Sequence, residues 1–505
     1  MAADIIEFKN VFCKYPQNSG YALENLNISV LKGEFLAVMG KNGSGKTTFC
    51  KLINGIIPHL CAGRLSGLVL VDGKSTVEQT VPQLALKAGI VLDDPDVQLF
   101  TSTVRDEAAF GPQNLLLPQD EILERIKYAL SAVGLKGFED RTPSTLSGGE
   151  KQRLSIAAAL AMKGEILILD DPLCRLDPDG AREVMAVLKN LRDQFGITIV
   201  MATCESDMTA KYADRVCVLN NGRIAALDKA ENIFSDCALL EENGIQPVNY
   251  SGNRNEMVFC NLSGISARTE AYDPRSKNPV IQITDFSYNY GQGDVSIKNI
   301  NLTIYENDFI AIIGKNGCGK TTLLKNITGL LRPSGGDILI HGRSIKKMSI
   351  SGISKEAGFV MQNPDTQLFT DSVFKETVFA LKNMRLSKTE IKKRALEAIA
   401  AAGLEEKADD YPHALSRTDR TRTVIACVLA MGCKIVIFDE IDAGNDYPGN
   451  VKIMNIARDL HQKGFTIIFV THNMFLANNY ARRIVKMERD GIVSDSAAGN
   501  SGDIQ

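Results

Sequence analysis

A glycine-rich stretch occurs twice in the chain, and this repetition restricts the possible folds more than any other feature. It reads GKNGSGKTT over residues 40–48 and GKNGCGKTT over residues 314–322. Three more pairs follow in the same order. They are AGIVLDDPDVQLF (88–100) with AGFVMQNPDTQLF (357–369), ILILDDP (166–172) with IVIFDEI (435–441), and TIVMATC (198–204) with TIIFVTH (466–472). This self-similarity indicates a tandem duplication of one domain.

The repeats predict domains at residues 1–245 and 280–495, a linker at 246–279 and a polar tail at 496–505. The linker is polar and rich in Gly, Ser, Asn and Pro, as connecting segments are. A chain of 505 residues with 44% hydrophobic and 23% charged residues is long enough, and ordinary enough, for two domains that each bury a core. We therefore expect two similar globular domains.

Composition also excludes several classes of protein. The net charge of -3 provides no basic field for a phosphate backbone, so we expect no nucleic-acid partner. The start, MAADIIEFKN, is not a secretory signal, and no apolar run approaches the ~20 residues of a membrane helix. The 11 cysteines form no Cys-x-x-Cys pair, which favours reduced thiols, and the histidines share no metal-ligand spacing.

Each copy alternates strands and helices, which predicts an α/β fold. EFLAVMG (34–40) and DFIAIIG (308–314) are short apolar runs, typical of strands in a buried parallel sheet, and each leads through a glycine loop into a helix. Apolar residues at helical spacing predict a helix over residues 120–135. Asn221-Gly222 and Asp490-Gly491 predict hairpins near the end of each copy.

The glycine-rich stretches match the P-loop pattern, in which backbone N–H groups surround phosphates, Lys reaches the β and γ oxygens and Thr binds Mg²⁺. The predicted nucleotide-binding residues are Gly40, Asn42, Gly43, Gly45, Lys46, Thr47 and Thr48 in the first copy and Gly314, Asn316, Gly317, Gly319, Lys320, Thr321 and Thr322 in the second. Asp170 and Asp439 each end an apolar strand, where a carboxylate helps to hold the metal. The following residue, Glu440 or Asp171, is then placed to act as general base.

A second pair of stretches differs sharply between the copies. LSGGEKQR (146–153) puts two glycines after a serine at the start of a predicted helix, so Ser147 and the Gly149 N–H are candidate donors to an anion. The later copy, LSRTDRTR (415–422), has Arg417 and Thr418 in place of Gly148 and Gly149. A glycine turn capping a helix is the alternative interpretation of the first stretch.

With P-loop, glutamine loop, LSGGE, strand acid and switch histidine in order, each copy resembles the ATP-binding subunit of an ABC transporter. The resemblance implies ATP and Mg²⁺, and two P-loop NTPase domains that each add an antiparallel β subdomain and a helical subdomain to the parallel-sheet core. It also implies head-to-tail pairing of the two domains, with each ATP held between one P-loop and the other domain's LSGGE. Tyr15 and Tyr290 match the family's adenine-stacking aromatic residue.

The departures from the family pattern sort onto one composite site. The family's glutamine, glutamate and histidine are Gln362, Glu440 and His472 in the second copy but Asp93, Asp171 and Cys204 in the first. The altered LSGGE lies instead in the second copy. Under head-to-tail pairing, every departure from the family pattern falls at the site built on Lys46. The other site keeps the full family set, which is Lys320, Thr321, Gln362, Asp439, Glu440 and His472 with Ser147, Gly148 and Gly149. We expect the first site to hydrolyse ATP, with Lys320, Gln362, Glu440 and His472 catalytic and Thr321, Gln362, Asp439, Thr47 and Asp170 near the metal.

The losses have physical consequences. The Asp171 carboxylate lies roughly 1.5 Å back from that of a glutamate, a displacement that can cost on the order of 10²-fold in rate. Cys204 is a weak donor in place of an imidazole. Losing one oriented transition-state contact typically costs about 3 kcal/mol. We expect nucleotide binding but little turnover at the Lys46 site.

The glutamine-loop regions narrow the resemblance. DDPDVQLFTSTVRDEAAFGPQN and QNPDTQLFTDSVFKETVFALKN are similar to those of energy-coupling factor ATPases, prokaryotic importers of vitamins and metal ions. That family implies a transmembrane coupling subunit, a membrane substrate-binding subunit and a peripheral position on the cytoplasmic face of the membrane. The alternative is a soluble tandem ATPase that acts on ribosomes, which would carry a long basic linker that this chain lacks. The transported substrate is not encoded here.

Overall fold

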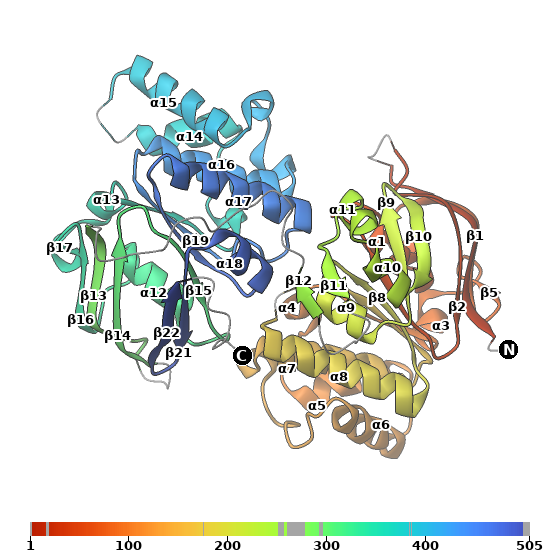
Figure 1. The fold of residues 1–505 in the computed structure, drawn as a ribbon. Coiled ribbons are helices and arrows are strands. Elements are labelled where there is room, and N and C mark those ends of the chain that lie inside the picture. Colours follow the sequence, from red (N-terminus) through yellow and green to blue (C-terminus); the bar gives the residue numbers. More distant parts are fainter. Residues whose placement is uncertain are drawn as a thin grey trace. The chain divides into compact units, whose positions relative to one another are not determined.

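The computed structural model describes residues 3–16, 20–174, 176–250, 257–259, 278–291, 296–382, 384 and 386–497. The chain divides into two compact units, residues 1–260 and 261–505 (Figure 1). Most of the predicted linker and all but two residues of the predicted tail lie outside the described residues. Within the linker region, β11 (Val248–Tyr250) and β12 (Met257–Phe259) form a small antiparallel sheet.

A six-stranded sheet forms the centre of the first unit. Its order is β10-β9-β3-β8-β7-β6, and only β10 runs antiparallel to its neighbour. The strands are β3 (Phe35–Met39), β6 (Ala88–Val91), β7 (Ile166–Asp170), β8 (Thr198–Thr203), β9 (Arg215–Asn220) and β10 (Arg223–Lys229). Along β3, Phe35 and Ala37 join one apolar cluster and Leu36 and Val38 another. Both faces of the sheet are therefore covered, as a parallel sheet requires.

An antiparallel sheet and helix α1 cover one face. The sheet has the order β2-β1-β4-β5, with β1 (Asp4–Lys14), β2 (Leu23–Leu31), β4 (Arg64–Val71) and β5 (Lys74–Ser75). Helix α1 (Lys46–Ile53) packs between the two sheets, because its apolar residues belong to the cluster that they share. Phe8 of β1 stacks on Phe49 of α1 with ring centroids 4.5 Å apart.

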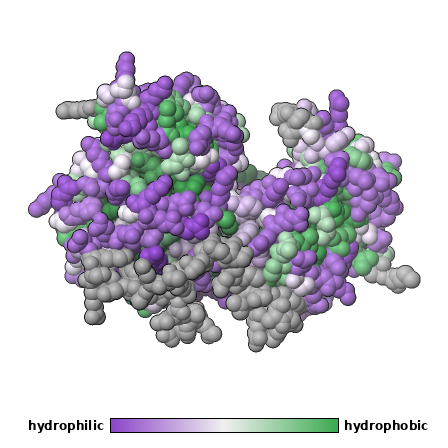
Figure 2. All heavy atoms as spheres, turned by 45° about the horizontal axis from the view of Figure 1, so that its top comes forward, coloured by the Kyte–Doolittle hydropathy of each residue, from purple (hydrophilic) through white to green (hydrophobic). Residues whose placement is uncertain are grey.

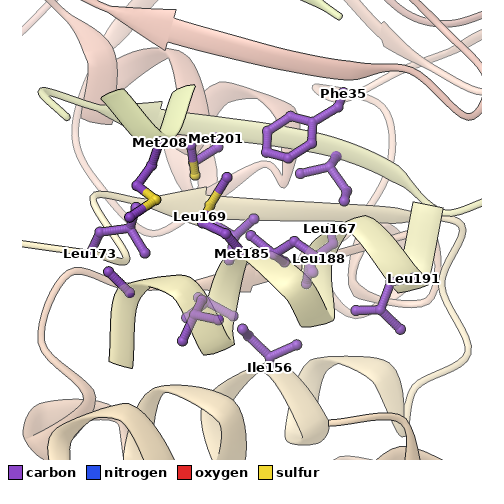
Figure 3. Close-up of a cluster of buried hydrophobic side chains, with 14 of the residues drawn as sticks. Phe35, Ile156, Leu167, Leu169, Leu173, Met185, Leu188, Leu191, Met201 and Met208 are labelled. Atoms are coloured by element: carbon purple, nitrogen blue, oxygen red, sulfur yellow. The ribbon is translucent and has the colours of Figure 1, made fainter. Parts of the chain in front are cut away.

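Helices cover the opposite face. Met185 and Leu188 of α8 (Pro178–Phe195) and Ile156 of α7 (Gly148–Leu160) lie in the same buried cluster as Leu169 and Met201 of the sheet (Figure 3). The other helices are α2 (Ile56–His59), α3 (Val81–Ala85), α4 (Pro95–Gln98), α5 (Val104–Asn114), α6 (Gln119–Ala132), α9 (Ser206–Tyr212), α10 (Ala230–Ser235) and α11 (Cys237–Glu242). Helices α5, α6 and α7 contact one another and form the helical subdomain.

The second unit repeats this architecture. Its sheets have the orders β18-β19-β20-β15-β21-β22 and β14-β13-β16-β17. The strands are β13 (Pro279–Asn289), β14 (Ser296–Tyr305), β15 (Phe309–Ile313), β16 (Gly335–Ile340), β17 (Arg343–Ser344), β18 (Ala357–Val360), β19 (Ile435–Asp439), β20 (Thr466–Val470), β21 (Arg483–Glu488) and β22 (Gly491–Ala497). The helices are α12 (Lys320–Ile327), α13 (Ile350–Ile353), α14 (Val373–Leu381), α15 (Lys388–Ala401), α16 (Arg417–Ala430), α17 (Tyr447–Gln462) and α18 (Met474–Tyr480).

The predicted α/β class, with a parallel-sheet core, an antiparallel subdomain and a helical subdomain in each copy, is confirmed. The helix expected over residues 120–135 is α6, and both predicted hairpins form, between β9 and β10 and between β21 and β22. Asn221 and Gly222 have φ values of 48° and 78°, the left-handed pair that a tight hairpin turn requires.

Hydrophilic side chains cover most of the face seen in Figure 2, with apolar patches between them. None of the described helices combines the length and the apolar character needed to cross a membrane. The ten cysteines in the described ranges are free thiols, and these ranges contain no cluster of His, Cys, Asp or Glu suited to a metal ion.

Candidate nucleotide-binding sites

Each predicted P-loop connects a central strand to a helix. In the first unit it joins β3 to α1, and in the second it joins β15 to α12. Gly40 has a φ of 148°, and a Cβ there would come within 2.2 Å of the Leu219 carbonyl oxygen. Gly314 is in the equivalent position, with a φ of 156°, and a Cβ there would come within 2.2 Å of the Met487 carbonyl oxygen. Only glycine fits at either position, so the loop lies against a neighbouring strand as it enters the helix.

The P-loop lysines occupy equivalent, buried positions. Lys46 Nζ donates to the carbonyl oxygens of Gly40, at 2.6 Å, and Lys41, at 3.1 Å. Lys320 Nζ donates to those of Gly314, at 2.8 Å, and Lys315, at 3.0 Å. Each ammonium group is thus held inside the loop that would surround a phosphate.

The next threonine meets the strand acid in both units. Thr47 donates to Asp170 Oδ1 at 3.1 Å, and Thr321 donates to Asp439 Oδ1 at 3.0 Å. Burial raises the pKa of Asp170, and it raises the pKa of Asp439 to about 6. A hydroxyl beside a poorly solvated carboxylate is an oxygen donor set that suits Mg²⁺.

The second unit brings all four predicted catalytic side chains together. Glu440 Oε2 accepts a 3.0 Å hydrogen bond from Gln362 Nε2. Glu440 Oε1 lies 3.3 Å from His472 Nε2 and 3.7 Å from Lys320 Nζ, and the latter two nitrogens are 3.2 Å apart. Burial alone would raise the pKa of Glu440, but the hydrogen bond from His472 and the nearby positive charges lower it on balance. The carboxylate is therefore ionised at neutral pH.

The equivalent residues of the first unit have different environments. Asp171 accepts a long, 3.4 Å hydrogen bond from the Thr203 hydroxyl, and burial raises its pKa to about 6. The Cys204 thiol contacts the Gly40 carbonyl oxygen at 3.6 Å, and burial raises its pKa to about 12. A neutral thiol that donates to the loop itself is a poor donor to phosphate.

The LSGGE stretch forms the start of α7. Ser147 is the N-cap, and it forms a capping box with Glu150: the Ser147 N–H donates to Glu150 Oε2 at 2.7 Å, and the Glu150 N–H donates to Ser147 Oγ at 3.3 Å. Ser147 and Gly148 are exposed. The helix-cap interpretation is therefore correct as a local description, and it leaves the glycine backbone accessible.

In the second unit, the side chains of the altered stretch bond to other residues of the same unit. Arg417 Nη2 donates to the Gln362 carbonyl oxygen at 3.1 Å, and Thr418 donates to Asn445 Oδ1 at 3.1 Å. Arg420 forms a 3.1 Å ion pair with Asp365. Arg417 and Arg420 therefore both bond to the glutamine loop of their own unit.

The two predicted adenine-stacking tyrosines lie beside their P-loops. Tyr15 Oη is 3.1 Å from Thr48 Oγ1, and Tyr290 Oη is 2.8 Å from Thr322 Oγ1. Tyr290 is 59% exposed, so one ring is open to solvent next to the phosphate loop.

Sequence reasoning missed one polar pair next to this site. Thr471, which precedes His472, donates to Asp442 Oδ2 at 2.5 Å. The only signal in the sequence is that Asp442 stands where the aligned first copy has Leu173.

Comparisons with known proteins agree with the fold. The family model described as "ABC transporter" matches residues 23–174 and 297–443. A protein of Methanosarcina acetivorans, provisionally named an ABC transporter ATP-binding protein, is 36% identical over 97% of this chain and 85% of its own length. One of Caldanaerobacter subterraneus subsp. tengcongensis, named in the same way, is 35% identical over 94% of this chain and 88% of its own.

Solved structures match single units. The structure of cbiO1 from Clostridium perfringens, part of the ABC transporter complex cbiONQ, is 33% identical, covers 45% of this chain and 91% of that one, and has a TM-score of 0.43. A dimeric ATP-binding cassette bound to ADP and Pi is 26% identical, covers 43% of this chain and 98% of that one, and has a TM-score of 0.40.

Proposed function

Because the chain belongs to the ABC transporter family and is an ATP-hydrolysing, ATP-binding subunit with two repeated ATPase domains, we propose that its two nucleotide sites are unequal. One composite site, made by the P-loop of residues 280–495 and the LSGGE of residues 1–245, hydrolyses ATP. The other, built on Lys46, holds nucleotide with little turnover. Such a division requires the head-to-tail pairing that the resemblance implies.

One observation carries this proposal: the Glu440 carboxylate has Gln362, His472 and Lys320 around it, whereas the Asp171 carboxylate is bonded to Thr203. A carboxylate that is ionised, and held among donors that can also orient water or phosphate, is suited to remove a proton from attacking water. The aspartate of the first unit is shorter and faces a different donor.

Each residue has a distinct role in the proposed hydrolysis. Lys320 and the P-loop N–H groups bind the β and γ phosphates, and His472 donates to the γ-phosphate. Glu440 accepts the proton of the attacking water, which the Gln362 amide helps to orient. Ser147 and the Gly149 N–H bind the γ-phosphate from the other domain. Thr321, Asp439 and Gln362 would hold Mg²⁺, which neutralises developing charge when bound.

A trapping experiment tests the asymmetry. Orthovanadate retains ADP at sites that have passed through hydrolysis, so we expect one trapped ADP per chain after incubation with Mg²⁺, ATP and vanadate. The Glu440→Gln variant should trap none. Two trapped nucleotides per chain would contradict the proposal.

We further propose that the chain drives an importer of the energy-coupling factor type, on the cytoplasmic face of the membrane. It would bind a transmembrane coupling subunit, which in turn carries a membrane substrate-binding subunit. The glutamine-loop motif supports this assignment, because its residues organise a loop that exposes aromatic side chains. In the second unit, Glu376 accepts N–H hydrogen bonds from Phe369, at 3.0 Å, and Thr370, at 2.7 Å.

That loop presents an apolar surface in each unit. Phe369 and Phe379 are 62% and 44% exposed and meet edge to face, with ring centroids 4.6 Å apart. Phe100 and Phe110 form the same pair in the first unit, at 4.8 Å. In the second unit the surface adjoins a hollow of about 230 Å³ lined mainly by apolar side chains, among them Ile350, Phe359, Met361, Ala380 and Met431. Exposed apolar patches of this kind suit a helix of a partner protein.

Co-purification tests the partner. The tagged chain, expressed in its own host and extracted from membranes with mild detergent, should retain a multispanning membrane protein. Phe369→Ser combined with Phe100→Ser should lose it and keep basal ATP hydrolysis. Co-sedimentation with ribosomes instead would favour the soluble alternative and contradict the importer assignment.

A further inference from the structure

The threonine before the switch residue has changed its hydrogen-bond acceptor between the two units. Thr203 precedes Cys204, and Thr471 precedes His472. Each hydroxyl accepts the backbone N–H two residues later, that of Glu205 at 3.0 Å and that of Asn473 at 2.9 Å. The two hydroxyls are therefore held in the same way, and each has one proton to donate.

The acceptors of that proton differ. Thr203 donates to Asp171 Oδ1 at 3.4 Å, the carboxylate in the general-base position. Thr471 donates instead to Asp442 Oδ2 at 2.5 Å, two residues beyond the general-base position. Leu173 stands at the position of Asp442 in the first unit and belongs to the apolar cluster of Figure 3, so no second carboxylate is present there.

The backbone does not account for this difference. In the second unit the Ala443 N–H donates to the Glu440 carbonyl at 3.1 Å, and the Asn445 N–H to the Asp442 carbonyl at 3.2 Å. The first unit has the same two turns, Cys174 to Asp171 at 3.4 Å and Leu176 to Leu173 at 3.1 Å. Two side chains differ here, Asp442 against Leu173 and Glu440 against Asp171, and only Asp442 adds a second acceptor for the threonine proton.

We infer that Asp442 is a positioning residue for hydrolysis, an assignment that rests on the proposed role of Glu440. By accepting the Thr471 hydroxyl, Asp442 keeps that donor away from Glu440. The Glu440 carboxylate then keeps its contacts with Gln362 and His472, at 3.0 and 3.3 Å. Without Asp442, the Thr471 hydroxyl would turn to Glu440, as its counterpart turns to Asp171.

The direct test gives the second unit the residue of the first. Asp442→Leu should lower kcat about 10- to 100-fold, because a displacement of about 1 Å at a catalytic group costs up to about 10²-fold. The Kd for a fluorescent ATP analogue and the KM should change less than threefold, since neither Lys320 nor the P-loop is altered. Asp442→Asn keeps an acceptor oxygen for Thr471 and should retain kcat within about threefold.

A second substitution tests whether kcat falls because the Thr471 hydroxyl bonds to Glu440 or because the structure is disturbed in general. In Asp442→Leu with Thr471→Val the competing hydroxyl is gone, so kcat should recover at least fivefold relative to Asp442→Leu alone. A crystal structure of the Asp442→Leu protein should show the Thr471 hydroxyl bonded to Glu440. The inference is overturned if Asp442→Leu keeps kcat within threefold, or if Thr471→Val gives no recovery.

Failure of this inference differs from failure of the proposed function. If Glu440→Gln abolishes hydrolysis while Asp442→Leu does not reduce it, only the role of Asp442 is wrong. If Glu440→Gln leaves hydrolysis intact, the assignment of the general base itself is wrong.

Discussion

The paired substitutions Glu440→Gln and Asp171→Asn test the unequal-site proposal most directly. Both replace a carboxylate by an amide of the same length at equivalent positions after β19 and β7. Glu440 is ionised and lies within 3.3 Å of His472 and 3.0 Å of Gln362, so the amide removes the proton acceptor from an assembled site. Asp171 accepts a 3.4 Å bond from Thr203 and a hydrogen bond from the Cys204 backbone, and an amide oxygen can accept both, so the substitution should change little.

The expected magnitudes are far apart. General-base catalysis contributes about 10²- to 10⁴-fold, so Glu440→Gln should lower kcat at least about 100-fold. Asp171→Asn should change kcat less than twofold. Two equal and independent sites would instead give about a twofold loss for each variant, because either substitution would leave one site working.

Steady-state phosphate release at saturating MgATP measures these rates. Binding of a fluorescent ATP analogue provides the control, and it should be retained in both variants because Lys46 and Lys320 are unchanged. Equal losses from the two substitutions, whether twofold or 100-fold, would refute the reasoning.

Three further predictions concern the caps, the pH dependence and the core. Ser147 and Ser416 each cap a helix, accepting an N–H at 3.3 and 3.2 Å, so changing either to Ala should cost about 1 kcal/mol of stability in denaturant titrations. Only Ser147→Ala should also lower kcat, by about tenfold; equal kinetic effects would contradict the assignment. Burial raises the pKa of Asp171 from 3.8 to about 6, so the folded state binds this proton more tightly and the contribution of Asp171 to stability falls as pH rises through about 4 to 6. The stability of Asp171→Asn relative to the unchanged protein should therefore be higher at pH 7.5 than at pH 4.5, by about 2 kcal/mol. The difference in Tm between the two proteins measures this change, and a pH-independent difference would contradict the prediction. Leu188 is fully buried, so Leu188→Ala should lower the free energy of unfolding by about 2–5 kcal/mol, seen as a lower urea midpoint.

Much of this architecture follows from local pattern. Short apolar runs that end in glycine predicted β3 and β15, and Asn221-Gly222 predicted a hairpin because few residue pairs adopt two left-handed conformations. The grouping of Gln362, Glu440 and His472 was predictable because consecutive parallel strands place their carboxyl ends at one edge of a sheet.

Other contacts depend on the rotamers that flexible side chains adopt, and these were not predictable from the sequence. The Arg417 guanidinium bonds to the Gln362 carbonyl oxygen within its own unit, and the stretch LSRTDRTR gives no sign of that acceptor. The bond between Thr471 and Asp442 escaped prediction for a similar reason: parallel pairing of β19 and β20 brings the two segments together, but it does not fix which acceptor the hydroxyl selects.

The backbone at Asp171 and Glu440 bears on how the two halves can diverge. Both residues adopt a left-handed conformation, with φ values of 49° and 46°, which costs energy for any residue with a side chain. The first unit has the same strained main chain at this position although it carries an aspartate instead of a glutamate. Under the proposed division of the two sites, exchanging a few side chains on this shared backbone would be enough to remove or restore hydrolysis at either site.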